Sequence, residues 1–151
     1  MHFILKSFNE LNVHQLYAIL QLREEVFNIE QNCIYKDIDN KDKKSWHLMG
    51  FVDEQLIAYA RLLPEEISFP NCCSIGRVVT SPAYRKSNYG FLLMQEAMLK
   101  LDILFPKTDV KISAQSYLIN FYQKFGFVVN SEEYMEDNLP HTEMIKIVAK
   151  Q

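Results

Sequence analysis

The sequence contains few of the residues that mark disulfide-rich, metal-binding or nucleotide-binding proteins. Only three cysteines occur among 151 residues, Cys33, Cys72 and Cys73, and none stands in CxxC spacing. This odd set predicts buried thiols and neither a disulfide framework nor a zinc or other metal site. The four glycines form no GxxxxGKS, GxxxxGKT or GxGxxG motif. A nucleotide P-loop and a dinucleotide-binding fold are therefore disfavoured.

An excess of positive charge and a long apolar run are also lacking. The 16 basic and 19 acidic residues give a net charge of −3, which argues against nucleic acid or an anionic membrane as a partner. No apolar run approaches the roughly 20 residues of a membrane helix, and no charged N-terminal segment leads into an apolar stretch. We expect a cytoplasmic protein in which any phosphate site is local.

The chain does contain enough apolar residues for a core. Hydrophobic residues make up 48% of the sequence, which suits one domain over residues 1–151. A strand is expected over His2–Phe8. Asn12 and Gln15 have the spacing of a capping box, and apolar residues at helical spacing then predict a helix to about Ile29.

The first helix carries a cation on its apolar stripe. Arg23 falls on that stripe, where a charge is costly unless it is paired. Glu30 follows on the same face and is the expected partner. The next stretch, Asn32–Ser45, is polar and charged, which predicts a loop with a short helical turn.

A hairpin, a third strand and a second helix are expected next. The apolar runs Trp46–Val52 and Leu56–Leu63 have the spacing of an antiparallel hairpin. A strand over Ser74–Thr80 should end at Ser81-Pro82, because proline cannot continue the ladder. The period then becomes helical, and this second helix should stop before Pro106. Its buried stripe is Leu93, Ala97, Leu101 and Leu104.

The C-terminal third predicts a strand, a helix and two further strands. The strand is marked by alternation from Val110 to Ala114, and Ser116 can cap a helix that ends at Gly126. The buried stripe of this helix is Leu118, Phe121, Tyr122 and Phe125. The last strands are expected over Phe127–Ser131 and Glu143–Val148. The fold class is α/β, in which an antiparallel meander feeds a right-handed parallel strand-helix-strand unit of a mixed sheet.

The stretch RVVTSPAYRKSNYGFLLMQEAM, residues 77–98, joins the third strand to the second helix. Its turn offers consecutive backbone N–H groups and two cations at a helix start, which together suit a pyrophosphate. The turn residues are Arg85, Lys86, Ser87, Asn88, Tyr89 and Gly90. An ordinary capped helix behind a solvated basic turn has the same pattern, so spacing alone leaves both interpretations open.

These residues resemble the central motif of the GNAT superfamily of N-acetyltransferases. In that family a strand leads to an Arg/Gln-x-x-Gly-x-Gly/Ala loop and a helix. The later stretch SAQSYLINFYQKFGF also resembles a family motif that ends in a Tyr and a Gly-Phe pair. More narrowly, LQLREEVFNIEQNCIYKDID, YARLLP, IGRVVTSP and EEYMEDNLPHTEM resemble the ElaA-type branch. The resemblance spans about Leu16 to Met144.

The resemblance implies a mixed, mostly antiparallel sheet flanked by helices, and acetyl-CoA as the cosubstrate. Its pyrophosphate would lie on the amides of residues 85–90, and its pantetheine arm would run beside Arg77, Val78 and Val79, where the two central parallel strands splay apart. Two positions depart from the family pattern, because Asn88 replaces the first loop glycine and Gln115 replaces the Asn that opens the later motif. Asn tolerates left-handed torsions, so the loop should keep its shape.

The implied reaction is direct attack by a primary amine on the thioester through a tetrahedral intermediate. Tyr122 matches the tyrosine that protonates the leaving thiolate in many members, and a strand N–H near Val79 would serve the oxyanion. By pattern alone Tyr122 is a core tyrosine. Glu30, Glu133 and His141 lie in segments that match the ElaA-type pattern and are candidates for the acceptor side. The base stays open, because a water relay would need none of these three.

The acceptor and the alternatives to catalysis also stay open. A small-molecule or peptide amine is expected, and five acidic residues are candidates to attract its cation. They are Asp37, Asp39, Asp42, Glu133 and Asp137. Asn88 and Gln115 favour the alternative of an acyl-CoA-binding sensor or interaction module without turnover. A longer acyl chain and a homodimer are compatible with the sequence.

Overall fold

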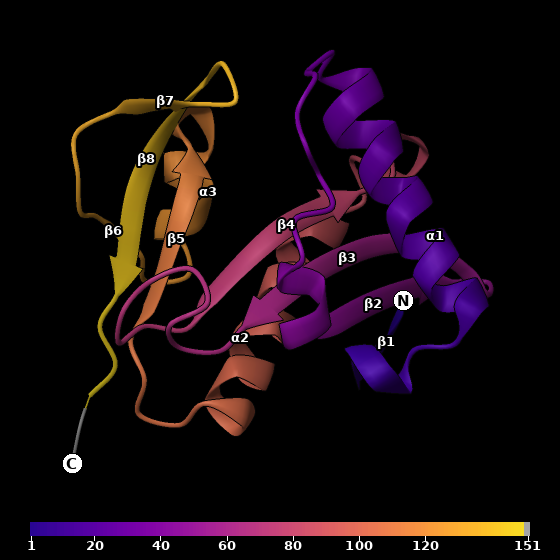
Figure 1. Cartoon of the computed structure of the whole chain (residues 1–151), viewed down its shortest axis with the longest axis horizontal. Coiled ribbons are helices and arrows are strands. Elements are labelled where there is room, and N and C mark those ends of the chain that lie inside the picture. Colours follow the sequence, from indigo (N-terminus) through magenta and orange to yellow (C-terminus); the bar gives the residue numbers. More distant parts are fainter. Residues whose placement is uncertain (150–151) are drawn as a thin grey trace.

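The computed structural model describes residues 1–149 and contains two four-stranded sheets (Figure 1). The strands are β1 (His2–Ser7), β2 (Trp46–Val52), β3 (Gln55–Leu63), β4 (Ser74–Thr80), β5 (Val110–Gln115), β6 (Val128–Val129), β7 (Tyr134–Glu136) and β8 (Leu139–Lys146). The first sheet has the order β1-β2-β3-β4 and is antiparallel throughout. The second sheet has the order β5-β8-β6, and β7 also pairs with β8.

Helices connect and cover these sheets. The α-helices are α1 (Val13–Arg23), α2 (Tyr89–Leu104) and α3 (Ile119–Gln123). Helix α1 continues as a π-helix, η2 (Glu24–Glu30). The 3-10 turns are η1 (Phe8–Glu10), η3 (Lys41–Lys44), η4 (Pro82–Tyr84) and η5 (Ser116–Leu118). None of the described helices is both long and apolar enough to cross a membrane.

Two apolar clusters hold α1 and α2 against opposite faces of the first sheet. Neighbouring strand residues alternate between them, so Leu48 packs in the cluster of α2 and Met49 in that of α1. Ile19 of α1 and Leu93 of α2 are both fully buried in their clusters. The first sheet is therefore a central layer between two helices, and its strand β4 is held from both sides.

The predicted parallel strand-helix-strand unit is β4-α2-β5. The two strands meet at a single parallel bridge between Cys73 and Val110, where Cys73 N donates to Asp109 O at 3.0 Å and Lys111 N donates to Cys73 O at 3.0 Å. Beyond that bridge the two sheets diverge like the arms of a V (Figure 1). The divergence creates the space in which the candidate site lies.

The start of the first helix is as predicted, but its continuation is not. Gln15 N donates to Asn12 Oδ1 at 2.8 Å and Asn12 N donates to Gln15 Oε1 at 3.1 Å, which confirms the capping box. The π-helical winding of η2 changes the angular phase of the residues that follow Arg23. The predicted Arg23–Glu30 pair is therefore wrong: Arg23 is fully buried and Glu30 is exposed.

The C-terminal region differs most from expectation. The predicted strand over Phe127–Ser131 is reduced to two residues, and β8 begins at Leu139 rather than at Glu143. The strand β7 was not predicted, although Asp137 and Asn138 take φ of +50° and +63° in the tight turn that joins it to β8. A two-residue turn of Asp and Asn is a hairpin signal, so the pattern was present in the sequence.

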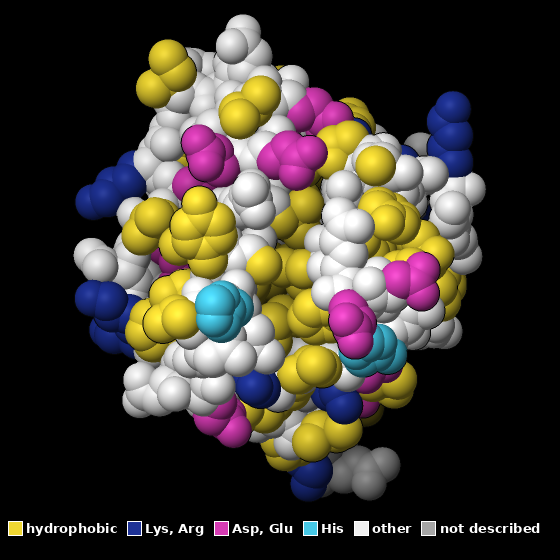
Figure 2. Space-filling view, turned by 90° about the vertical axis from the view of Figure 1, so that its right-hand side faces the viewer, with side chains coloured by type: hydrophobic (Ala, Val, Ile, Leu, Met, Phe, Trp, Pro, Cys, Tyr) yellow, Lys and Arg dark blue, Asp and Glu magenta, His cyan; other side chains and the backbone are white. Residues whose placement is uncertain are grey.

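The cysteines lie as predicted, and charged side chains of both signs are exposed. The three cysteines are buried, and burial raises the pKa of the Cys73 thiol to about 12. On the face seen from the α1 side, acidic and basic side chains are interspersed around a hollow lined by hydrophobic groups (Figure 2). Among the described residues no group of three or more His, Cys, Asp or Glu is placed to hold a metal ion.

Candidate active site

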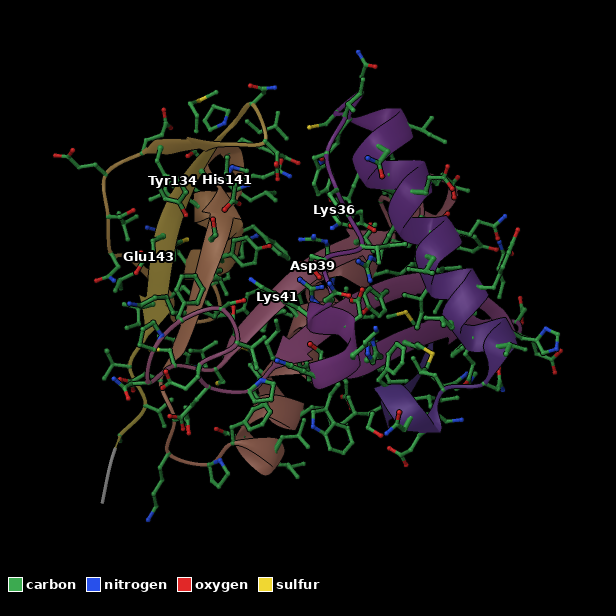
Figure 3. All side chains as sticks on the ribbon, viewed as in Figure 1. Lys36, Asp39, Lys41, Tyr134, His141 and Glu143 are labelled. Atoms are coloured by element: carbon green, nitrogen blue, oxygen red, sulfur yellow. The ribbon has the colours of Figure 1, made fainter. Side chains whose placement is uncertain are left out.

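A cavity of about 320 Å³ lies between the two diverging sheets. The first sheet and the loop after η2 form one wall, which includes Asp39, Lys41 and Arg61. Strands β5, β7 and β8 form the other wall, which includes Tyr134 and His141. Of the side chains labelled in Figure 3, Asp39 and Lys41 line the cavity from one side, and Tyr134 and His141 line it from the other. We call the wall formed by the first sheet and the loop after η2 the β4 wall, and the wall formed by β5, β7 and β8 the β8 wall.

A β-bulge shapes the part of β4 that faces the cavity. Tyr59 pairs with Val79 and Arg61 pairs with Gly76, so Arg77 and Val78 together lie opposite Ala60. Arg77 takes φ of +52°, an uncommon conformation for a long side chain and one that occurs in bulges. The bulge turns Val78 toward the cavity while Val79 packs in the cluster of α1.

The polar core of the β4 wall is a closed ring of three arginines and three aspartates. Each arginine contacts two aspartates and each aspartate contacts two arginines. The pairs are Arg23 Nη1–Asp42 at 2.8 Å, Asp42–Arg61 Nη1 at 3.0 Å, Arg61 Nη1–Asp39 at 2.8 Å, Asp39–Arg77 Nη2 at 3.3 Å, Arg77 Nε–Asp37 at 2.7 Å and Asp37–Arg23 Nε at 2.9 Å. We call it the Arg–Asp ring. Three positive and three negative charges give the ring a net charge of zero. This balance matters because burial of an unpaired charge is costly.

The ring lowers the pKa values of Asp39 and Asp42. Burial alone would raise the pKa of Asp42, but hydrogen bonds and charges from Arg23 and Arg61 outweigh it and lower that pKa. The pKa of Asp39 is lowered in the same way, since Arg61 and Arg77 outweigh its burial. Asp37, Asp39 and Asp42 are therefore committed to arginines. The expectation that they attract a cationic acceptor is not supported by this arrangement.

His47 and Tyr59 are buried beside Asp42 of the ring. His47 is 1% exposed, and its Nδ1 lies 2.8 Å from Tyr59 Oη while its Nε2 lies 2.9 Å from Asp42 O. A carbonyl can only accept, so Nε2 carries the proton and Nδ1 accepts from Tyr59. Burial lowers the pKa of His47, although Asp42 opposes this. The imidazole is thus neutral and holds Asp42 from behind.

The β8 wall carries a different group, made of Ser113, Tyr134, Glu136 and His141, which we call the β8 cluster. Ser113 Oγ contacts Tyr134 Oη and donates to Glu136 Oε2 at 3.2 Å. His141 Nδ1 donates to Leu139 O at 2.8 Å, which leaves Nε2 facing Glu136 Oε2 at 3.4 Å. His141 is 7% exposed, whereas half of the Glu136 side chain is exposed. The cluster therefore links a buried imidazole to a carboxylate at the cavity mouth.

Tyr122 lies at the inner end of the cavity. It belongs to α3, packs against Phe121 and Phe127 in edge contacts, and lines the cavity. Burial, followed by the nearby Tyr117, raises the pKa of Tyr122, so its phenol stays protonated. Val78, Gln115 and His141, three further residues singled out from the sequence, line the same cavity. The two walls also touch across its rim, where Cys33 Sγ donates to Asp137 O at 3.0 Å.

The predicted phosphate-binding turn lies outside the cavity, at the start of α2. Residues 85–88 are exposed, and Lys86 and Asn88 take φ of +73° and +63°. Asn88 occupies the N-cap in this left-handed conformation without a side-chain cap bond, so its amide group leaves the first helical N–H groups uncapped. A side chain at Gly90 would meet only Thr80 Cγ2, at 4.0 Å. Tyr89, the first residue of α2, lies beside Tyr84.

Two acceptor-side candidates lie away from the cavity lining. Glu30 instead holds Arg85 in a bidentate pair, with Nη1 and Nη2 donating at 2.8 and 2.7 Å. Glu133 is exposed in the turn before β7. Sequence reasoning missed Arg61, Ser113, Tyr134 and Glu136, which do line the cavity. For Ser113, Tyr134 and Glu136, the only signal in the sequence was a hydroxyl or carboxylate at alternate positions of a strand.

Comparison with known proteins gives a consistent result. A family model described as an acetyltransferase (GNAT) domain matches residues 7–148. The protein ElaA of Escherichia coli (strain K12) is 42% identical over 142 residues, which cover 93% of this chain and 92% of ElaA. The crystal structure of Escherichia coli ElaA matches with a TM-score of 0.90 at 40% identity, over 97% of this chain and 99% of that one.

Two further solved structures share the architecture. An acyl-CoA N-acyltransferase from Pseudomonas aeruginosa matches with a TM-score of 0.90 at 40% identity, over 97% of this chain and 99% of that one. The PaiA N-acetyltransferase from Thermoplasma acidophilum, in complex with coenzyme A, has a TM-score of 0.68 at 19% identity, over 98% and 100% of the two chains. The first likeness confirms the predicted fold class, and the second is one of fold alone.

Proposed function

The chain belongs to the GNAT acetyltransferase family, and from this premise we propose that it transfers an acetyl group from acetyl-CoA to a primary amine. The observation that carries the proposal is the single bridge between β4 and β5, beyond which β4 has a free edge beside a cavity. Backbone groups on such an edge need partners. The amide-rich arm of acetyl-CoA supplies them, and the thioester supplies an activated acyl group.

The exposed turn at the start of α2 suits the pyrophosphate. The amides of residues 85–90 lie at the positive end of a 16-residue helix, with Arg85 and Lys86 beside them. The missing side chain of Gly90 lets a ligand approach the backbone closely. Asn88 keeps the left-handed torsion that glycine has in the family pattern. The neighbouring structure from Thermoplasma acidophilum is a coenzyme A complex, which supports the same class of ligand.

Tyr122 is the proposed proton donor to the leaving sulfur. Its phenol lines the cavity, and its raised pKa keeps it protonated near neutral pH. The backbone of the β4 bulge, at Val78 and Val79, is the proposed group that stabilises negative charge on the acyl oxygen.

The β8 cluster is proposed to receive the proton that the acceptor loses. Glu136 reaches the cavity mouth, where its carboxylate can hold an ammonium group and accept its proton. His141 Nε2 lies 3.4 Å from the same carboxylate, so the proton has a second acceptor deeper in the wall. Of the candidates named from sequence, His141 therefore keeps a proposed role, whereas Glu30 and Glu133 do not.

The test has two stages that separate an enzyme from an acyl-CoA sensor. Thermal shift with acetyl-CoA measures binding, and release of free CoA thiol across a panel of primary amines measures transfer. We expect stabilisation by acetyl-CoA and thiol release that depends on the amine. Stabilisation without amine-dependent thiol would support the sensor, and no stabilisation would remove the assignment. Propionyl-CoA and butyryl-CoA in the same assay report the acyl-chain preference.

A further inference from the structure

We propose that the acceptor amine carries a carboxylate, and that the side edge of Arg61 binds this carboxylate in the cavity. The inference rests on the proposed function and names the class of its acceptor: a small amino carboxylate. Its amine would face the β8 cluster while its carboxylate faces the β4 wall. Four features of the cavity support the inference: the hydrogen bonding of Arg61, the glycine beside it, the charges of the two walls and the size of the cavity.

Arg61 has one edge of its guanidinium in use and one edge open. At the end of the guanidinium, Nη1 and Nη2 donate hydrogen bonds to the carboxylate of Asp39 at 2.8 and 3.0 Å, and Nη1 also donates to Asp42. Its Nε has no hydrogen-bond partner, and within residues 1–149 it is the one buried side-chain nitrogen or oxygen of which this is true. The N–H bonds of Nε and Nη2 on the side edge are parallel, the geometry that matches two carboxylate oxygens.

Gly76 keeps space beside this edge. It pairs with Arg61 across β3 and β4, so a side chain there would lie on the same face as the guanidinium. A Cβ at Gly76 would lie 3.8 Å from Nη2 and 3.9 Å from Nε. Both residues line the cavity. The unpaired Nε of Arg61 therefore lies beside a residue that has no side chain. A buried donor without a hydrogen-bond partner is costly, and a bound ligand would supply that partner.

The charges of the two walls suit a ligand with opposite charges at its two ends. The Arg–Asp ring is neutral, but Lys41 also lines the β4 wall, and its Nζ donates to Ser68 Oγ at 3.2 Å. No described carboxylate lies within ion-pair distance of Lys41, so this wall has an excess positive charge. The β8 wall contributes Glu136 and Asp137. An amino carboxylate would place its carboxylate beside the positively charged wall and its ammonium beside the negatively charged wall.

The size of the cavity argues for a small acceptor. Its volume of about 320 Å³ is at the low end for small-molecule sites. The contact between Cys33 and Asp137 bridges its rim, which leaves little room for a folded protein to insert a lysine. A peptide N-terminus has its carboxylate many bonds from the amine, so it would not span the two walls. A free amino carboxylate does.

Matched sets of amines test the proposal. Each set contains an amino carboxylate, its carboxamide, the amine without the carboxyl group and the aminophosphonate, for α-, β- and longer amino carboxylates. Thiol release with acetyl-CoA gives kcat/KM for each compound. We expect at least one amino carboxylate to exceed its carboxamide and its decarboxylated amine by about tenfold or more. Equal rates within every set, or a preference for the aminophosphonates, would overturn the proposal.

Two variants locate the carboxylate. Gly76→Ala places a methyl group against the open edge of Arg61 at ordinary contact distance, and Lys41→Met removes the excess cation. Each should raise KM for the preferred amino carboxylate several-fold while KM for acetyl-CoA and for the decarboxylated amine stays unchanged. Lys44→Met, an exposed lysine of the same turn η3, is the matched control. Unchanged KM values in both cavity variants would overturn the assignment to Arg61.

Thermal shift with the same compounds in the presence of CoA separates this inference from the proposed function. It reports acceptor binding whether or not transfer occurs. A carboxylate-dependent shift without thiol release would support the carboxylate site and count against the transferase. Thiol release without any carboxylate dependence would support the transferase and overturn the carboxylate site.

Discussion

The two walls of the cavity are built from different chemistry. The β4 wall holds its polar groups in a closed Arg–Asp ring, in which Arg23, Arg61 and Asp42 are almost fully buried. In the β8 wall, single hydrogen bonds link Ser113 to Tyr134 and to Glu136, His141 Nε2 lies 3.4 Å from Glu136, and half of Glu136 is exposed. In the ring every charged group is paired with two others, whereas the β8 wall presents a carboxylate that no described arginine or lysine holds. We infer that one wall positions the acceptor and the other moves its proton.

The difference has a structural origin. Asp37, Asp39 and Asp42 come from a loop without regular strands, and this loop is fixed because arginines of α1, β3 and β4 all point at it. In the β8 wall, Ser113, Tyr134 and His141 lie on paired strands, so the sheet itself fixes them. Loss of one charge should therefore unfold the first arrangement, and loss of one hydroxyl or carboxylate should only weaken the second.

Arg23→Met tests this contrast most severely. The variant leaves Asp37 and Asp42 in a buried site with one arginine fewer, so we expect a loss of about 3–5 kcal/mol in the free energy of unfolding. Urea denaturation followed by circular dichroism measures it. Arg85→Met, which removes an arginine from a half-exposed pair, is the control and should cost about 1 kcal/mol or less. Similar losses in the two variants would contradict the conclusion that the buried Arg–Asp ring is needed for folding.

Tyr122→Phe should have the next largest effect, on turnover and not on stability. Removal of the phenol takes away the proposed proton donor, and we expect kcat to fall about 100-fold, roughly 2.7 kcal/mol of barrier. The dissociation constant of acetyl-CoA, from calorimetry, should not change, because the ring packing remains. Tyr17→Phe, the control, removes an exposed hydroxyl of α1 and should leave kcat unchanged. An unaffected rate in the first variant would remove Tyr122 from the mechanism.

Acidification should weaken the β4 wall in two steps. The folded protein lowers the pKa of His47, so below the ordinary value of about 6.5 the unfolded chain binds the proton more readily and stability falls. Asp39 and Asp42 also have lowered pKa values. Their contribution is present above their ordinary value of 3.8 and is lost as pH falls further.

Thermal unfolding between pH 8 and pH 5 measures the first step. His47→Gln should flatten the dependence in this range, because the group that gains the proton on unfolding is gone. His14→Gln, on the exposed side of α1, should leave the dependence as it is in the unchanged protein. A wild-type stability that rises as pH falls from 6.5 to 5 would show that the sign of the His47 effect is reversed.

Sequence reasoning found the cofactor side of this protein better than the acceptor side, for a physical reason. The turn over residues 85–90 is contiguous and lies where a strand signal changes to a helix signal, so local pattern is enough. The Arg–Asp ring joins residues 14 to 40 positions apart, and each of them alone is an ordinary charged residue. Only the fold brings them together.

The same contrast applies to the elements themselves. The alternating strand β5 and the Asn12 capping box were predicted within a residue or two, because burial of one face of a strand has a period of two and the capping box has a fixed spacing. The pairing of Arg23 failed because the π-helical turn after it breaks the period of 3.6 on which the prediction relied. Strand β7 has three residues and is fixed by its turn and by β8 rather than by a hydrophobic face.

Glu30→Gln should have the smallest effect, and it tests the region outside both walls. Glu30 holds Arg85 in a bidentate pair with both side chains about 40% exposed, so its removal should change the free energy of unfolding by about 1 kcal/mol or less. Arg85 would then be free to meet a phosphate, so acetyl-CoA should bind slightly more tightly, by up to about fivefold, and less so at high salt. Calorimetric titration at 50 and 500 mM salt measures this, with the exposed Glu25→Gln as control. Weaker binding would mean that acetyl-CoA binds best while Arg85 is paired with Glu30, and not when Arg85 is free.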